Sequence, residues 1–96
     1  MRLTKYEIES IKKSFLDVFG DGKIYLFGSR VDDEKKGGDI DLYLCPSKKF
    51  EDERKKRINF IIKLEEYIGE QKIDIILRKD TNRTIEKVAL RDGIEL

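Results

Sequence analysis

The first part of the chain has apolar residues at helical spacing. They recur every three to four residues, which places them on one face of a helix, and the segment before them has the spacing of a capping box, with Thr4 as N-cap and Glu7 three residues later. Gly20 follows the last apolar position and is a natural C-cap. We therefore expect a helix over residues 5–19. Its apolar positions are Ile8, Ile11, Phe15, Val18 and Phe19.

Two short apolar runs follow, typical of β-strands. Residues 23–27 are apolar on both faces, as a central strand requires. Residues 39–45 alternate instead, so that Ile40, Leu42 and Leu44 point to one face, while Asp39 and Asp41 point to the other, about 7 Å apart. Charged residues crowd the loop between the runs, and we expect that loop to be solvated. Two carboxylates projecting together from an apolar strand require an explanation.

The next apolar stripe predicts a long helix that ends near Ile68 and is closed by Gly69. Pro46 and Ser47 end the preceding strand, and Ser47 offers an N-cap. The second half of this helix carries the stripe, whereas residues 51–57 are almost all charged. Two interpretations of that charged half stay open: a solvated helical end, or a basic run that helps to hold a polyanion.

The last part of the chain predicts a third strand and a third helix. Residues 71–78 alternate, with aliphatic side chains on one face and Asp74 on the other. Residues 82–92 have helical spacing, with Thr81 as N-cap and Gly93 as C-cap, and Ile94 is placed to contact the helix in a Schellman-type closure. The apolar stripe of this tail either packs on the sheet or forms a surface for a partner or a second copy. The stripe consists of Ile85, Val88, Ala89, Ile94 and Leu96.

Composition limits the classes of protein and of chemistry. A chain of 96 residues is expected to form one domain over residues 1–96, and a net charge of +1 argues against a nucleic-acid partner. The sequence has no histidine and one cysteine, Cys45, so that catalysis would use carboxylates, hydroxyls, lysine or arginine. Cys45, Tyr25 and Tyr43 are interpreted as packing residues. No long apolar run or signal-peptide pattern occurs, so we expect a cytoplasmic protein without a membrane segment.

The order strand, long helix, strand favours a parallel pair with a right-handed crossover. Asp39, Asp41 and Asp74 then lie at one end of the sheet, and an antiparallel first strand brings Gly28 and Ser29 to the same end. Carboxylates are preferred ligands of Mg²⁺ and Mn²⁺, and two acids on one strand face can bridge two ions about 4 Å apart. Glycine allows the backbone to approach a phosphate closely. The pattern therefore indicates metal-assisted phosphoryl or nucleotidyl transfer.

These residues carry a family resemblance. Gly28-Ser29, then Asp39-Ile40-Asp41 after a nine-residue loop, and a third acid in a short strand resemble the nucleotidyltransferase superfamily that includes DNA polymerase beta. The chain is most similar to the minimal nucleotidyltransferases of the MntA antitoxin type. The resemblance implies an α/β (α+β) nucleotidyltransferase fold of order α-β-β-α-β-α. It further implies a small mixed sheet, three-stranded or slightly larger, with the helices packed on one face.

The resemblance also implies roles for single residues. Asp39 and Asp41 would bind the two Mg²⁺ ions, with Mn²⁺ as an alternative, that hold a nucleoside triphosphate such as ATP. Asp74 would bind the ion that activates the attacking hydroxyl. Residues that would contact the phosphates are Gly28, Ser29, Arg30 and Gly38.

Only 22 residues follow Asp74, too few for the helical second domain of larger members. By resemblance, the partner is an all-helical HEPN-type toxin encoded nearby, and the protein is an antitoxin that transfers AMP to a tyrosine of that toxin. Two alternatives remain: a non-catalytic antitoxin that neutralises its partner by contact, and an enzyme that nucleotidylates the hydroxyl of a small molecule. Residue by residue, Asp39 could instead begin a strand, Asp74 could pair with Arg78, and Gly28-Ser29 could be an ordinary turn.

Overall fold

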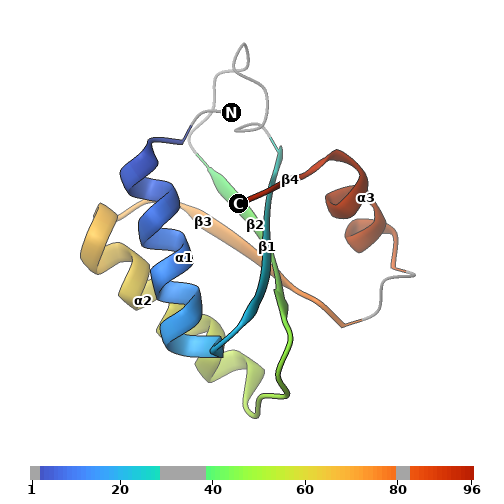
Figure 1. Ribbon diagram of the computed structural model, residues 1–96, viewed down its shortest axis with the longest axis horizontal. Coiled ribbons are helices and arrows are strands. Elements are labelled where there is room, and N and C mark those ends of the chain that lie inside the picture. The colour runs from blue at the N-terminus through green and yellow to red at the C-terminus, as the bar shows by residue number, and fades with distance from the viewer. Residues whose placement is uncertain (1–2, 29–38, 80–82) are drawn as a thin grey trace.

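The computed structural model describes residues 3–28, 39–79 and 83–96. Its helices are α1 (Lys5–Phe19), α2 (Glu53–Ile68) and α3 (Thr84–Asp92). Its strands are β1 (Gly22–Phe27), β2 (Ile40–Pro46), β3 (Ile73–Leu77) and β4 (Ile94–Glu95). The strands form one mixed sheet in the order β3-β2-β1-β4 (Figure 1). The expected fold class and the order α-β-β-α-β-α are confirmed, with a short fourth strand added at the end.

The two pairings that the sequence predicts are present. β1 pairs antiparallel with β2, and Phe27 lies opposite Asp41. β2 pairs parallel with β3, and Asp41 lies opposite Asp74. Because α2 connects β2 to β3, the parallel pair is a helix crossover, as the order of the elements predicts.

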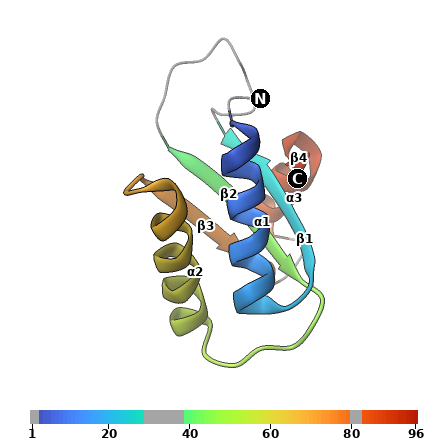
Figure 2. The ribbon, with the colours of Figure 1, turned by 60° about the vertical axis from the view of Figure 1, so that its left-hand side comes forward.

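α1 and α2 cover one face of the sheet (Figure 2). Phe15 of α1 and Phe60 of α2 are at most 1 % exposed and pack on the aliphatic face of the strands. The capping box of α1 is present, since the Thr4 side chain accepts from the Glu7 amide while the Glu7 side chain accepts from the Thr4 amide. The predicted bounds of this helix, residues 5–19, are confirmed because both ends are encoded locally.

α3 lies on the opposite face, which corrects the expectation that all helices pack on one face. Ala89 of α3 is fully buried and packs in a second cluster with Tyr43 and Cys45. Tyr43 and Cys45 are apolar or aromatic residues on the Asp41 side of β2, so that face also needs a cover over its middle. The tail stripe is thereby divided, since Ala89 packs on the sheet and Leu96 on the main core, while Ile85 remains 46 % exposed.

The predicted start of α2 and the predicted Schellman-type closure of α3 are wrong. α2 begins at Glu53, not near Ser47, because the Ser47 amide donates to the Asp21 carbonyl and holds that residue in the turn after β2. Asp52 is the N-cap and accepts from the Lys55 amide. α3 ends at Asp92 with Gly93 as its C-cap, as predicted, but Gly93 has φ −78°, so the Schellman closure is absent and the chain continues into β4, opposite β1. The expected N-cap Thr81 lies outside the described residues.

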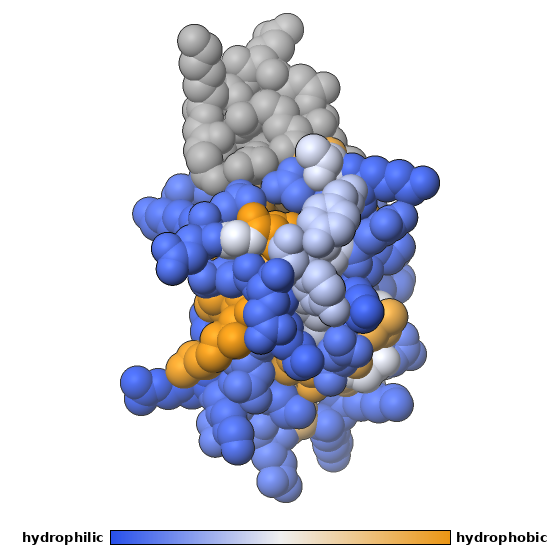
Figure 3. Space-filling view, turned by 90° about the vertical axis from the view of Figure 1, so that its left-hand side faces the viewer, coloured by the Kyte–Doolittle hydropathy of each residue, from blue (hydrophilic) through white to orange (hydrophobic). Residues whose placement is uncertain are grey.

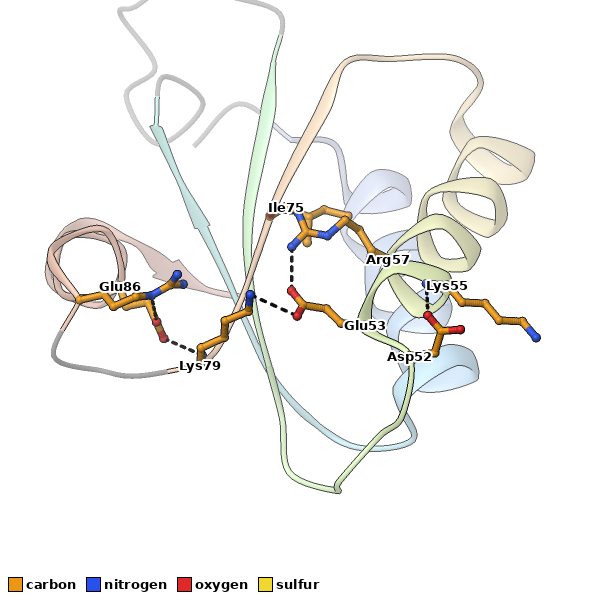
Figure 4. A network of polar contacts seen from close by, with 8 residues as sticks. Asp52, Glu53, Lys55, Arg57, Ile75, Lys79 and Glu86 are labelled. Carbon is orange, nitrogen blue, oxygen red and sulfur yellow. Dashed lines mark hydrogen bonds and ion pairs between the residues drawn. The ribbon is translucent and has the colours of Figure 1, made fainter.

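Charged side chains in the first half of α2 contact neighbouring parts of the fold (Figure 4). Arg57 donates to the Ile75 carbonyl on β3 at 2.7 Å and pairs with Glu53, which also pairs with Lys79 at 3.2 Å. Lys56 donates to the Val18 carbonyl at 3.0 Å. These contacts favour a structural role over polyanion binding for the side chains of Lys56 and Arg57. The surface seen from the side of α1 and α2 is mostly hydrophilic, with hydrophobic side chains in small groups (Figure 3).

Candidate active site

Three sequence-predicted acids lie at the ends of β2 and β3 where both strands begin. Asp41 is in β2 and Asp74 in β3, while Asp39 immediately precedes β2. Alternation places Asp41 on the side of the sheet away from α1 and α2, because its neighbours Ile40 and Leu42 are fully buried in the main core. The apolar positions of β2 thus anchor the strand, and the acids project from the other face.

Asp41 and Asp74 form the centre of this group. They are partners in the parallel ladder, and their carboxyl groups lie within hydrogen-bonding reach of one another. The pKa of Asp41 is raised from its usual value by burial, then by the negative charges of Asp74 and Asp39, and by the hydrogen bond with Asp74. Clustered negative charge of this kind is relieved either by a proton or by a cation.

Asp39 has a different neighbour. Its Oδ2 lies 3.4 Å from Nζ of Lys72, the residue two positions before Asp74. The positive charge of Lys72 also acts on Asp41, where it opposes the rise in pKa. The sequence interpretation missed Lys72, although its position beside the third acid was a usable signal. Lys72 is therefore the cation nearest to this acidic group among the contacts of the described residues.

Gly28 supplies the space that the Asp41 side chain occupies. It follows Phe27, the last residue of β1, has φ +76°, and lies against the Asp41 side chain. A Cβ at this position would collide with Oδ2 of Asp41 and would lie 3.0 Å from its Cγ. A glycine is required here both by the backbone conformation and by the close approach of the carboxylate. Because of this contact, the alternative that Gly28 only forms an ordinary turn does not fully explain the glycine.

For the other predicted site residues, only their positions in the sequence are known. Ser29, Arg30 and Gly38 lie outside the described residues. The alternative pairing of Asp74 with Arg78 is absent from the ion pairs of the described residues, and the two positions are about 13 Å apart along the strand. Within residues 3–28, 39–79 and 83–96, no group of three or more acidic, His or Cys side chains is arranged to hold one ion.

The donor set nevertheless fits a divalent cation at the Asp41–Asp74 pair. Both groups are carboxylates, which Mg²⁺ and Mn²⁺ prefer, they are adjacent, and their mutual repulsion favours a cation between them. Asp39 is two residues away on the same strand face, but it is directed to Lys72. The arrangement provides two carboxylates ready for a cation and a third within reach.

A buried acid on α3 was missed entirely. Glu86 is fully buried and accepts from the Tyr43 hydroxyl at 2.7 Å, from the Lys79 amide at 3.1 Å and from Arg83 Nε at 2.6 Å. Figure 4 shows Glu86 between the helix and the strand end. Burial and the bond to Glu86 raise the pKa of Tyr43, which keeps its hydroxyl protonated. This network fixes α3 to β2 two residues from Asp41.

Comparison with known proteins agrees with this geometry. A family model described as "Polymerase beta, Nucleotidyltransferase" matches residues 9–96. A search among curated proteins found no match. No helix in the described part of the chain is both long and apolar enough to cross a membrane. With a match over nearly its whole length, this chain belongs to the polymerase beta nucleotidyltransferase family.

Proposed function

We propose that this protein transfers a nucleoside monophosphate, AMP from ATP, to an acceptor hydroxyl, and that Asp39, Asp41 and Asp74 hold two divalent ions for this reaction. The observation that carries the proposal is the register of Asp41 opposite Asp74, with Gly28 packed against the Asp41 carboxylate. Family membership supports a nucleotidyltransferase and a nucleoside triphosphate substrate. Beyond family membership, the proposal names the nucleotide that is used, the metal ions and the residues that bind them.

The chain's own groups have distinct tasks in this proposal. Asp41 and Asp74 are adjacent, and so they are the pair that would share a cation. Asp39 would complete the set after leaving Lys72, from which it is separated by 3.4 Å in a partly exposed pair. Such a pair contributes only about 0–1 kcal/mol, so its loss is a small cost. Bound there, the ions would neutralise the triphosphate and polarise the attacking hydroxyl.

The end of β1 beside the acids would hold the phosphates. Gly28 brings the backbone against the Asp41 carboxylate, so that a phosphate bound by backbone amides at this turn would lie next to the proposed ions. For Ser29, Arg30 and Gly38 the phosphate-binding role is proposed from sequence. Their place in the motif, beside Gly28 and Asp39, supports it.

We further propose that the acceptor is a tyrosine of an all-helical HEPN-type toxin encoded nearby, so that the protein acts as an antitoxin. The support is the resemblance of the whole chain to the minimal nucleotidyltransferases. Several apolar side chains also remain exposed on α3 and β4, where a partner could dock. They are Ile85, Leu90 and Ile94, each between 37 % and 46 % exposed.

The test is incubation with labelled ATP and Mg²⁺, with and without the neighbouring helical protein, followed by detection of label on a gel. The matched variants are Asp41→Asn and Asp92→Asn, since Asp92 is an exposed acid paired with Arg91 and far from the site in sequence. Label on the partner that disappears only with Asp41→Asn supports the proposal. If the label persists with Asp41→Asn, the transfer reaction does not depend on Asp41 and the proposed site is wrong.

The remaining outcomes separate the alternatives. No transfer, together with neutralisation of the toxin by an Asp39→Asn, Asp41→Asn double variant, would show a non-catalytic antitoxin. Label on a small-molecule hydroxyl, but not on the protein partner, would show that the protein nucleotidylates a small molecule.

A further inference from the structure

A second site lies on the same face of the sheet as the acids but at the other end of the strands. It is a pocket of about 300 Å³ between α3 and the end of β2. Its lining includes Lys23, Tyr25, Cys45, Arg78 and Leu90. Pockets of this volume are at the lower end of the range that holds small organic ligands.

This pocket is distinct from the acidic group. Cys45 is four residues from Asp41 along β2, and Arg78 is four residues from Asp74, a separation of about 13 Å in each case. Tyr43 lies between Asp41 and Cys45 on that face and is fully buried, with Ala89 of α3 in the same cluster. The covered middle of the strand therefore lies between the two sites.

Two cationic side chains flank the pocket. Lys23 comes from β1 and Arg78 follows β3, so that they stand on either side of Cys45 in the central strand. Burial raises the pKa of the Cys45 thiol, while the hydrogen bond with Tyr43 and the positive charges of Arg78 and Lys23 lower it and the negative charge of Glu86 raises it. Neither side chain forms an ion pair in the described parts of the chain. Glu86, the acid whose charge acts on this pocket, is paired with Arg83. Two positive charges on either side of Cys45 then favour a doubly charged anion such as a phosphate.

The rest of the lining is apolar and partly aromatic. Tyr25 is half-buried and lines the pocket together with Leu90 of α3 and Pro46. Such a wall suits a flat, largely apolar ring, because an aromatic side chain can stack on it. The pocket therefore combines a phosphate-sized charge with a surface for a ring.

We propose that this pocket binds a nucleoside monophosphate, with the phosphate between Lys23 and Arg78 and the base against Tyr25. The positive charges and the apolar wall together indicate that the ligand is a phosphate monoester that carries a ring. The choice of a nucleotide among such esters rests on the proposed function, in which the protein handles nucleotides. This site would hold a second nucleotide, separate from the one at the acids.

The experiment is calorimetric titration of the purified protein with AMP in EDTA, which removes metal-dependent binding at the acids. The decisive variant is Arg78→Gln, and the matched control is Arg54→Gln on α2, an exposed arginine on the other face of the sheet. We expect Arg78→Gln to weaken AMP binding at least tenfold, since it removes a charge-assisted contact to phosphate. Arg54→Gln and Asp41→Asn should bind AMP as the wild type does.

The following binding results would overturn the proposal. Equal binding by Arg78→Gln, or no binding at millimolar AMP, would show that the pocket does not hold a nucleotide. Loss of binding in Asp41→Asn would place AMP at the acids. Inorganic phosphate that binds as tightly as AMP would show that no ring is recognised. The transfer assay is read separately, so that AMP binding without transfer would overturn only the proposed function.

Discussion

Replacing Asp41 with asparagine should stabilise the metal-free protein. The pKa of Asp41 is raised by burial and by the charges of Asp74 and Asp39, so its ionisation costs more in the folded state than in the unfolded chain. Stability is therefore greatest below the unfolded pKa and falls as the pH rises through the higher folded pKa. Asparagine has nearly the same size, keeps the contact with Gly28, and has no charge to repel.

The magnitude follows from the position of the side chain. Each unit of difference in pKa corresponds to about 1.4 kcal/mol, but the side chain is only partly buried and solvent screening reduces the effect. We expect a gain of about 0.5–1 kcal/mol at neutral pH. For a domain of this size that gain corresponds to a rise in Tm of about 2–8 °C.

The assay is thermal unfolding in EDTA at pH 7 and again at pH 3, followed by addition of Mg²⁺. The gain should vanish at pH 3, where the wild-type carboxyl is protonated. The comparison is Asp39→Asn, which removes the pair with Lys72 but also relieves the repulsion of Asp41, so that its net effect on stability should be smaller than that of Asp41→Asn. Mg²⁺ should stabilise the wild type and have little effect on Asp41→Asn.

Two results would refute this reasoning. If Asp41→Asn melts below the wild type in EDTA, Asp41 is a structural residue and the acids do not repel one another. If Mg²⁺ stabilises Asp41→Asn as much as it stabilises the wild type, the cation binds elsewhere.

Three further predictions follow from single contacts. Gly28→Ala and Gly69→Ala each place a Cβ at a positive φ, +76° and +80°, at a cost of about 1–2 kcal/mol in urea unfolding, to which Gly28→Ala adds its collision with Asp41. Only Gly28→Ala should weaken Mn²⁺ binding, since Gly69 faces open space. Lys72→Met should tighten Mn²⁺ binding about two- to fivefold by removing a competing cation, while Lys79→Met, which loses a pair with Glu53, should not. Glu86→Gln should lower the free energy of unfolding by about 3–5 kcal/mol, measured with urea, and a loss below 1 kcal/mol would show that its buried contacts are not stabilising.

Most of the fold and the centre of the site could be predicted from sequence because their signals are local. The ends of α1 depend on a capping box and a glycine within a few residues, and the bounds are correct. Alternation along β2 assigned Asp41 and its aliphatic neighbours to opposite faces, and the strand-helix-strand order placed Asp41 beside Asp74. The roles of these residues in catalysis stay predictions until the transfer assay is made.

What only the tertiary structure decided depends on contacts between distant residues. The sequence pattern shows that α3 is amphipathic, but only Tyr43 and Cys45 on the far face of β2 determine where Ala89 packs. A glutamate in a polar-looking helix is expected to be solvated, and Glu86 is buried because donors from β2, the end of β3 and Arg83 converge on it. The spacing of apolar residues and the helix caps thus determined the helices and strands of this protein and the face that each one buries. Contacts between distant elements decided which charged side chains are buried and which remain free to bind a ligand.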